Sequence, residues 1–168
     1  MSIVLGLDVA ATTGYALIRQ TPTGPKVLAY GAAPARTAAD VQNALTMALA
    51  VLGDERPARC AIEAGYCGPN VRTGLQLAEL RGRFRQLLEL AGVECELIAP
   101  SAWRKTQLVT PPKSKRAELK RAARAAVKER FGIEATADEA DAVLLACHAA
   151  SSASPEILST PAPQSSLT

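Results

Sequence analysis

Four carboxylates in this 168-residue chain have the types and positions to bind metal ions. Asp8 and Glu63 each end a short apolar run that predicts a buried strand. Asp138 and Asp141 are spaced i, i+3 at the start of an expected helix, so they share one face of it. If the fold brings these positions together, the chain has a cluster of four acids.

Clustered acids of this kind favour a particular chemistry. An acid at the end of a buried strand is unfavourable unless a positive charge compensates it. Four such groups repel one another until cations bind, and ligands that are all oxygen select hard divalent ions such as Mg²⁺ or Mn²⁺. Two such ions roughly 3.5–4 Å apart support phosphodiester hydrolysis by in-line attack of water. We therefore expect a hydrolytic site with two ions.

The hydrophobic pattern predicts the elements that must position these acids. The first three strands form an antiparallel meander over residues 3–9, 15–18 and 26–31. The elements expected after it are a helix over residues 37–53, a strand over 58–63, a long helix over 71–91, a strand over 93–98, a short helix from Pro100 with Ser101 as its N-cap, a basic helix over 114–130 ending at Gly132, and a last helix over 137–149 capped by Thr136.

This order predicts an α/β domain over residues 1–150, with a five-stranded mixed sheet and helices on both faces. It is the order of a ribonuclease H-like fold, whose acids come from the first strand, the fourth strand and the last helix. Residues 151–168 are rich in Ser, Pro and Thr and are expected to form a disordered tail.

Charge is distributed unevenly along the chain, although the net charge is only +3. Between Arg104 and Arg130 there are ten Lys and Arg residues against two acids. Arg116, Lys120 and Arg124 recur at four-residue spacing, and we expect this stripe to contact phosphates. A basic block beside an acidic cluster is typical of a nuclease.

The sequence lacks the features of membrane-spanning, secreted and zinc-binding proteins. No apolar run is long enough to cross a membrane, and the N-terminus lacks the pattern of a signal peptide, so a cytoplasmic location is expected. The spacing of the cysteines does not favour zinc, and reduced, mostly buried thiols are expected at all four: Cys60, Cys67, Cys95 and Cys147.

Three motifs together resemble the RuvC type of Holliday-junction resolvase. They are residues 6–8 with 13–16, residues 62–66 and residues 138–142. The resemblance covers roughly residues 3–149. It implies a homodimer that cuts four-way DNA junctions at two symmetric points with Mg²⁺ or Mn²⁺. The family's catalytic, metal-binding acids match Asp8, Glu63, Asp138 and Asp141.

The resemblance also implies roles in DNA binding and assembly. An aromatic residue that stacks on a base matches Tyr66, and a basic residue of the site matches either Lys113 or Lys115. The dimer helix matches residues 71–91, which carry more apolar side chains than one stripe needs. Val9-Ala10 replaces the usual Pro-Gly, and the segment before Asp138 is long, as in a divergent or phage-type branch.

Other functions are compatible with parts of this pattern. Asp8 with Thr13-Gly14 resembles the phosphate-binding hairpin of actin-like and sugar-kinase ATPases, but those need two such domains and 168 residues supply one. A broader structure-selective nuclease, acting on flaps, branched DNA or RNA–DNA hybrids, would use the same acids. A binding module that keeps the fold without catalysis is disfavoured because all four acids are present.

Overall fold

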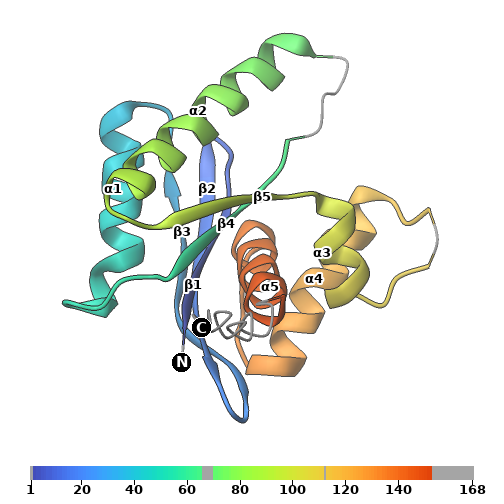
Figure 1. The fold of residues 1–168 in the computed structure, drawn as a ribbon. Helices are drawn as coiled ribbons and strands as arrows, with labels where there is room; N and C mark the ends of the chain where they lie inside the picture. The colour runs from blue at the N-terminus through green and yellow to red at the C-terminus, as the bar shows by residue number, and fades with distance from the viewer. Residues whose placement is uncertain (1, 66–69, 112, 153–168) are drawn as a thin grey trace, which may run out of the picture.

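The computed structural model describes residues 2–65, 70–111 and 113–152. Its elements follow one another in the predicted order (Figure 1). They are β1 (Ile3–Asp8), β2 (Thr12–Thr21), β3 (Gly24–Pro34), α1 (Ala38–Leu49) with the short 3-10 helix Ala50–Leu52, β4 (Arg59–Glu63), α2 (Val71–Leu90), β5 (Glu94–Ile98), α3 (Pro100–Gln107), α4 (Arg116–Phe131) and α5 (Ala137–Ser151).

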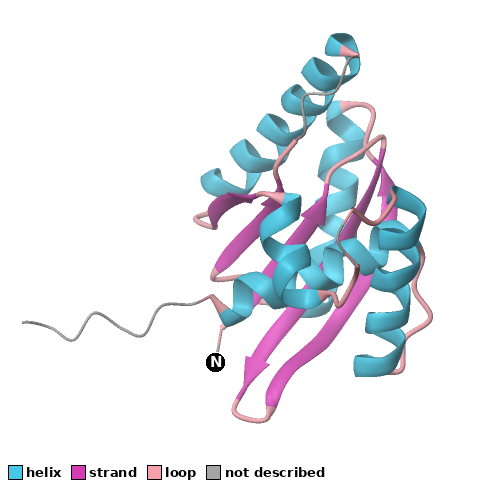
Figure 2. Ribbon diagram, turned by 90° about the vertical axis from the view of Figure 1, so that its right-hand side faces the viewer, coloured by secondary structure: helices cyan, strands magenta, loops and turns pink. Residues whose placement is uncertain are grey.

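The five strands form one mixed sheet in the order β3-β2-β1-β4-β5. The pairs β1–β2 and β2–β3 are antiparallel, whereas β1–β4 and β4–β5 are parallel. Helices α1 and α2 cover one face, and α3, α4 and α5 lie on the other (Figures 1 and 2). The predicted five-stranded sheet with helices on both faces is confirmed.

The alternation of side chains along β1 explains the two layers. Leu5 and Leu7 belong to a core cluster that includes Phe84 of α2. Val4, pointing to the opposite face, belongs to a second cluster that includes Leu144 of α5. All five side chains are essentially fully buried. A strand with both faces covered has a nearly continuous apolar sequence, as β1 does.

Two glycines allow α5 to lie unusually close to the sheet. A Cβ atom added at Gly6 of β1 would overlap the carbonyl oxygen of Ala142, and one added at Gly14 of β2 would overlap that of Asp138. Gly14 pairs with Asp8 in the β1–β2 register. The missing side chains therefore bring the first turn of α5 directly over the end of β1.

The capping predictions were correct at two helix ends and wrong at one. The Thr136 hydroxyl accepts from the Glu139 backbone N–H, and the Glu139 carboxylate accepts from the Thr136 N–H, which completes a capping box for α5. Gly132 ends α4 in the left-handed conformation. Ser101 is not an N-cap, because α3 already begins at Pro100, which fits the first turn without an N–H to satisfy.

Some predicted boundaries also shift. Strands β2 and β3 are longer than predicted and pair from Thr12–Pro34 at one end to Thr21–Gly24 at the hairpin. Helix α5 continues to Ser151, so this residue belongs to the domain and not to the predicted tail. The rest of that tail beyond residue 152 lies outside the described residues.

The structure bears in part on the predictions about membrane spans and cysteines. In the described parts of the chain, no helix is long and apolar enough to span a membrane; a cytoplasmic location stays a prediction. Cys60 and Cys147 are buried and Cys95 is half-buried, and all three are free thiols. Cys67 lies outside the described residues.

The close approach of α5 can be tested at Gly14. We expect Gly14→Ala to lower the free energy of unfolding by about 1–3 kcal/mol, because the new methyl group overlaps backbone that cannot move alone. Gly74→Ala is the matched control: no atom lies within 4 Å of its added Cβ in α2, so it should stabilise the protein by about 0.5–1 kcal/mol. Denaturant unfolding measures both, and a Gly14→Ala variant as stable as the parent contradicts this packing.

Candidate active site

All four predicted acids line one pocket of about 480 Å³. Asp8 ends β1 and Glu63 ends β4, and the parallel register of these strands puts both acids at the same edge of the sheet. Asp138 and Asp141 come from the first turns of α5. This helix can lie close to the same edge of the sheet because Gly14 has no side chain. The sequence prediction that the four acids meet is correct.

The acids affect one another's ionisation. Burial, followed by the charges of Glu63, Asp141 and Asp138, raises the pKa of Asp8 to about 7. Burial and the charge of Glu63 likewise raise the pKa of Asp141 to about 6, and nearby Arg104 and Lys120 oppose that rise. Negative charge thus accumulates here beyond what the surroundings neutralise.

Four basic side chains line the same pocket: Arg81, Arg104, Arg116 and Lys120. The Lys120 Nζ lies 2.8 Å from Asp138 Oδ1, and an Arg104 guanidinium nitrogen lies 3.6 Å from Glu63 Oε2. Arg81 reaches in from α2 and lies against the backbone at Gly65. The pocket therefore combines four acids with positive charge suited to phosphates.

Glu63 has one further partner, Trp103 of α3. The indole Nε1 donates a hydrogen bond of 2.7 Å to Glu63 Oε2. Trp103 is fully buried and serves as a core anchor. Its contact with an acid of the pocket was not predicted.

The chemistry of the donor set fits a hard divalent cation, since the four acids supply only carboxylate oxygens and repel one another. In this arrangement, however, no three acidic, histidine or cysteine side chains of the described residues converge on one point. Two of the four acids have basic partners instead: Lys120 pairs with Asp138, and Arg104 lies beside Glu63.

The predicted DNA-contact residues separate into three groups. Arg116 and Lys120 line the acidic pocket. Arg124, the third member of the predicted stripe, donates from Nε to the carbonyl of Ala135 and borders a different hollow. Lys113 precedes α4 and lines another hollow, and Lys115 is the residue immediately before α4. Tyr66 lies outside the described residues.

Sequence reasoning did not assign Arg81 or Arg104 to the site. Arg104 follows the buried Trp103 by one residue, and Arg81 stands among other arginines of α2 that do not share its face. Two of these, Arg83 and Arg85, pair with glutamates of the same helix. No local sequence pattern distinguishes the arginine that faces the acids from those that face solvent.

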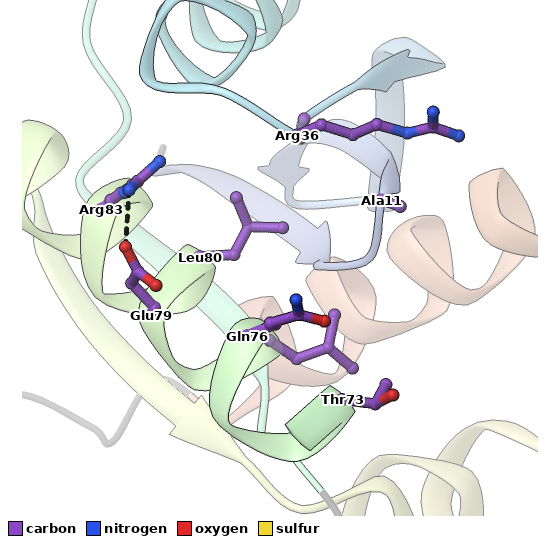
Figure 3. Close-up of a pocket in the computed structure, with 9 residues that line it drawn as sticks. Ala11, Arg36, Thr73, Gln76, Glu79, Leu80 and Arg83 are labelled. Atoms are coloured by element: carbon purple, nitrogen blue, oxygen red, sulfur yellow. Dashed lines mark hydrogen bonds and ion pairs between the residues drawn. The ribbon is translucent and has the colours of Figure 1, made fainter. Parts of the chain in front are cut away.

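A second pocket, of about 460 Å³, lies between α2 and the segment that leads into α1 (Figure 3). Figure 3 shows Arg83 paired with Glu79 along α2, and Leu80 and Gln76 on the same side of the pocket. Glu79 is the one acid that lines it, and that charge is already neutralised. This pocket lacks the carboxylates for the expected chemistry.

The chain was compared with known proteins by sequence and by structure. No protein-family model matches it, and no curated protein matches it in sequence. Among solved structures, RuvC from T. thermophilus in complex with a Holliday junction substrate superposes with a TM-score of 0.67 at 16% identity, over 88% of this chain and 92% of that one.

Two other resolvases have similar structures. The yeast mitochondrial Holliday junction resolvase Ydc2 gives a TM-score of 0.56 at 15% identity, over 89% of this chain and 78% of that one. The fowlpox virus resolvase, solved with its substrate Holliday junction DNA, gives 0.55 at 12% identity, over 89% and 99%. At this level of identity the likeness shows the fold alone: the chain has the ribonuclease H-like fold that these resolvases have.

Proposed function

We propose that this protein is a metal-dependent endonuclease that resolves four-way DNA junctions by paired symmetric nicks. The observation that carries the proposal is the meeting of Asp8, Glu63, Asp138 and Asp141 in one pocket. The fold adds support, since the T. thermophilus and fowlpox virus proteins of similar structure were solved with Holliday junctions. Branched DNA is thus the proposed partner.

The four acids are the proposed ligands of two Mg²⁺ ions, for which Mn²⁺ can substitute. Ions held by these four acids would supply activation of an attacking water and stabilisation of the departing 3′ oxygen. The neighbouring basic residues would bind the DNA backbone. Lys120 and Arg104 border the acids, and Arg81 and Arg116 extend the positive charge along the pocket, so phosphate oxygens on either side of the cut have donors within the site.

The proposed assembly is a homodimer formed largely through α2. This helix buries only Leu80, Phe84 and Leu88. Among its exposed large hydrophobic residues are Val71 and Leu75, which are 69% and 67% exposed. A two-fold dimer would present two acidic pockets to a junction that itself has two-fold symmetry, which accounts for paired cuts.

Removing one ligand tests the assignment of the acids. We expect Asp8→Asn to lower the rate of junction cleavage in Mg²⁺ by more than about 100-fold while junction binding persists, because the change removes charge without removing volume. Asp54→Asn, at an exposed acid outside the pocket, is the matched control and should cleave normally. Rapid cleavage by Asp8→Asn refutes the proposed site.

The raised pKa values predict how stability varies with pH. A carboxyl whose pKa is higher in the folded than in the unfolded state stabilises the fold at low pH and ceases to do so as pH rises through the folded value. With EDTA present, the melting temperature should therefore fall between about pH 4 and pH 7, where Asp8 and Asp141 ionise readily in the unfolded chain but resist ionisation in the folded protein.

Calorimetry of the parent and of Asp8→Asn isolates this effect from other titrating groups. The variant should show a smaller fall, and 10 mM Mg²⁺ at pH 8 should raise the melting temperature of the parent by a few degrees more than that of the variant. If the melting temperatures of the two proteins fell in parallel with pH, the acids would not interact.

The dimer is tested on the exposed face of α2. Leu75→Glu should convert the protein from dimer to monomer in light scattering, because a charge replaces an apolar side chain in the interface. Val109→Glu, which changes a fully exposed residue between α3 and α4, should leave the dimer intact. A parent protein that is monomeric at tens of micromolar contradicts the proposed assembly.

A further inference from the structure

Glu63 is held from one side by two consecutive residues of α3. Trp103 Nε1 donates to Glu63 Oε2 at 2.7 Å, and the Arg104 guanidinium lies 3.6 Å from the same oxygen. Among the described residues, none donates a hydrogen bond to Oε1, the other oxygen of this carboxylate. The two oxygens of Glu63 therefore have different surroundings before any ion binds.

We propose that Trp103 is a positioning residue for metal binding: its indole N–H fixes Oε2 of Glu63 and leaves Oε1 as the oxygen that binds the ion. This inference rests on the proposed function, since it assigns Glu63 as a metal ligand. It adds a residue from outside the acid set and specifies which oxygen of Glu63 serves as the ligand.

The surroundings of Trp103 make it a rigid anchor. The side chain is fully buried in the core cluster between the sheet and helices α3, α4 and α5. An indole has a single donor and no acceptor, and a buried donor without a partner is unfavourable by the full cost of its desolvation. The hydrogen bond thus fixes both side chains: Glu63 satisfies the buried N–H, and the packed ring holds the carboxylate.

Arg104 reinforces this orientation. Its guanidinium carbon lies 4.9 Å from the centre of the Trp103 ring, within the range of a cation–π contact. The nearest approach of the same guanidinium to Glu63 is also at Oε2. Both contacts place positive charge or a donor on the protein side of Glu63, and Glu63 in turn borders the pocket that contains the other three acids.

A ligand held in this way needs little rearrangement when an ion arrives. A side chain that donates to a metal ligand fixes its orientation, and removal of such a partner weakens metal affinity by about 10–100-fold. We expect this loss when the indole N–H is removed, even though Trp103 itself contacts no ion.

Trp103 is the only tryptophan of the chain, which permits a change of a single group. Growth of a tryptophan auxotroph on β-(3-benzothienyl)alanine replaces the N–H by sulfur while keeping the shape of the ring. Trp103→Phe is a second variant that also lacks the donor. Phe84→Leu is the matched packing control, because Phe84 is equally buried but belongs to the other core cluster.

Calorimetric titration with Mn²⁺, without DNA, gives the readout. The sulfur isostere and Trp103→Phe should bind Mn²⁺ about 10–100-fold more weakly than the parent, whereas Phe84→Leu should bind normally. In the parent, Mn²⁺ should also quench the Trp103 fluorescence, and Glu63→Gln should abolish this quenching at the same Mn²⁺ concentrations.

The outcomes separate this inference from the function on which it rests. If the parent fails to bind Mn²⁺ at millimolar concentration, the proposed metal site itself is wrong. If the parent binds and the isostere binds equally well, the acids remain the site and the role of Trp103 is refuted. Equal weakening in Phe84→Leu and in the isostere would show loosened packing and would also overturn the inference.

Discussion

The close contact between α5 and the β1–β2 pair is the constraint on which the site depends. Gly6 and Gly14 provide it, because any side chain at either position would overlap the backbone of α5. The contact places Asp138 and Asp141 beside the acid at the end of β1. Parallel pairing of β1 with β4 adds Glu63 at the same edge. Four acids that are far apart in sequence thus share one pocket through backbone packing.

That packing brings four carboxylates together, and basic side chains of the protein neutralise only part of their negative charge. Burial, and then the charges of neighbouring acids, raises the pKa of Asp8 and of Asp141. Lys120 and Arg104 pair with Asp138 and Glu63, whereas Asp8 and Asp141 have no direct basic partner among the described residues. Under the proposed function, these two unpaired acids would be the ones left for cations from solution. Neutralisation by the protein alone would leave no binding site for an ion.

Much of this arrangement could be predicted from the sequence, because it follows from local patterns. Apolar runs ending in Asp8 and Glu63 indicate strands, and Thr136 with Glu139 indicates the start of α5. The contacts of Arg81, Arg104 and Trp103 could not be predicted, since each depends on which face of a helix meets a distant strand. Ser101 illustrates a local error: serine is a good N-cap residue, but Pro100 already occupies the first turn of α3.

The central claim is that this acidic pocket cuts four-way DNA junctions. The most direct measurement is a cleavage assay in Mg²⁺ or Mn²⁺ with end-labelled four-way junctions, duplexes, flaps and RNA–DNA hybrids, followed by mapping of the cut positions. We expect paired nicks at symmetric positions, confined to the junction. Equal cutting of flaps or hybrids would leave the acids in place but indicate a broader structure-selective nuclease. Tight junction binding with no cutting in either metal would contradict the account.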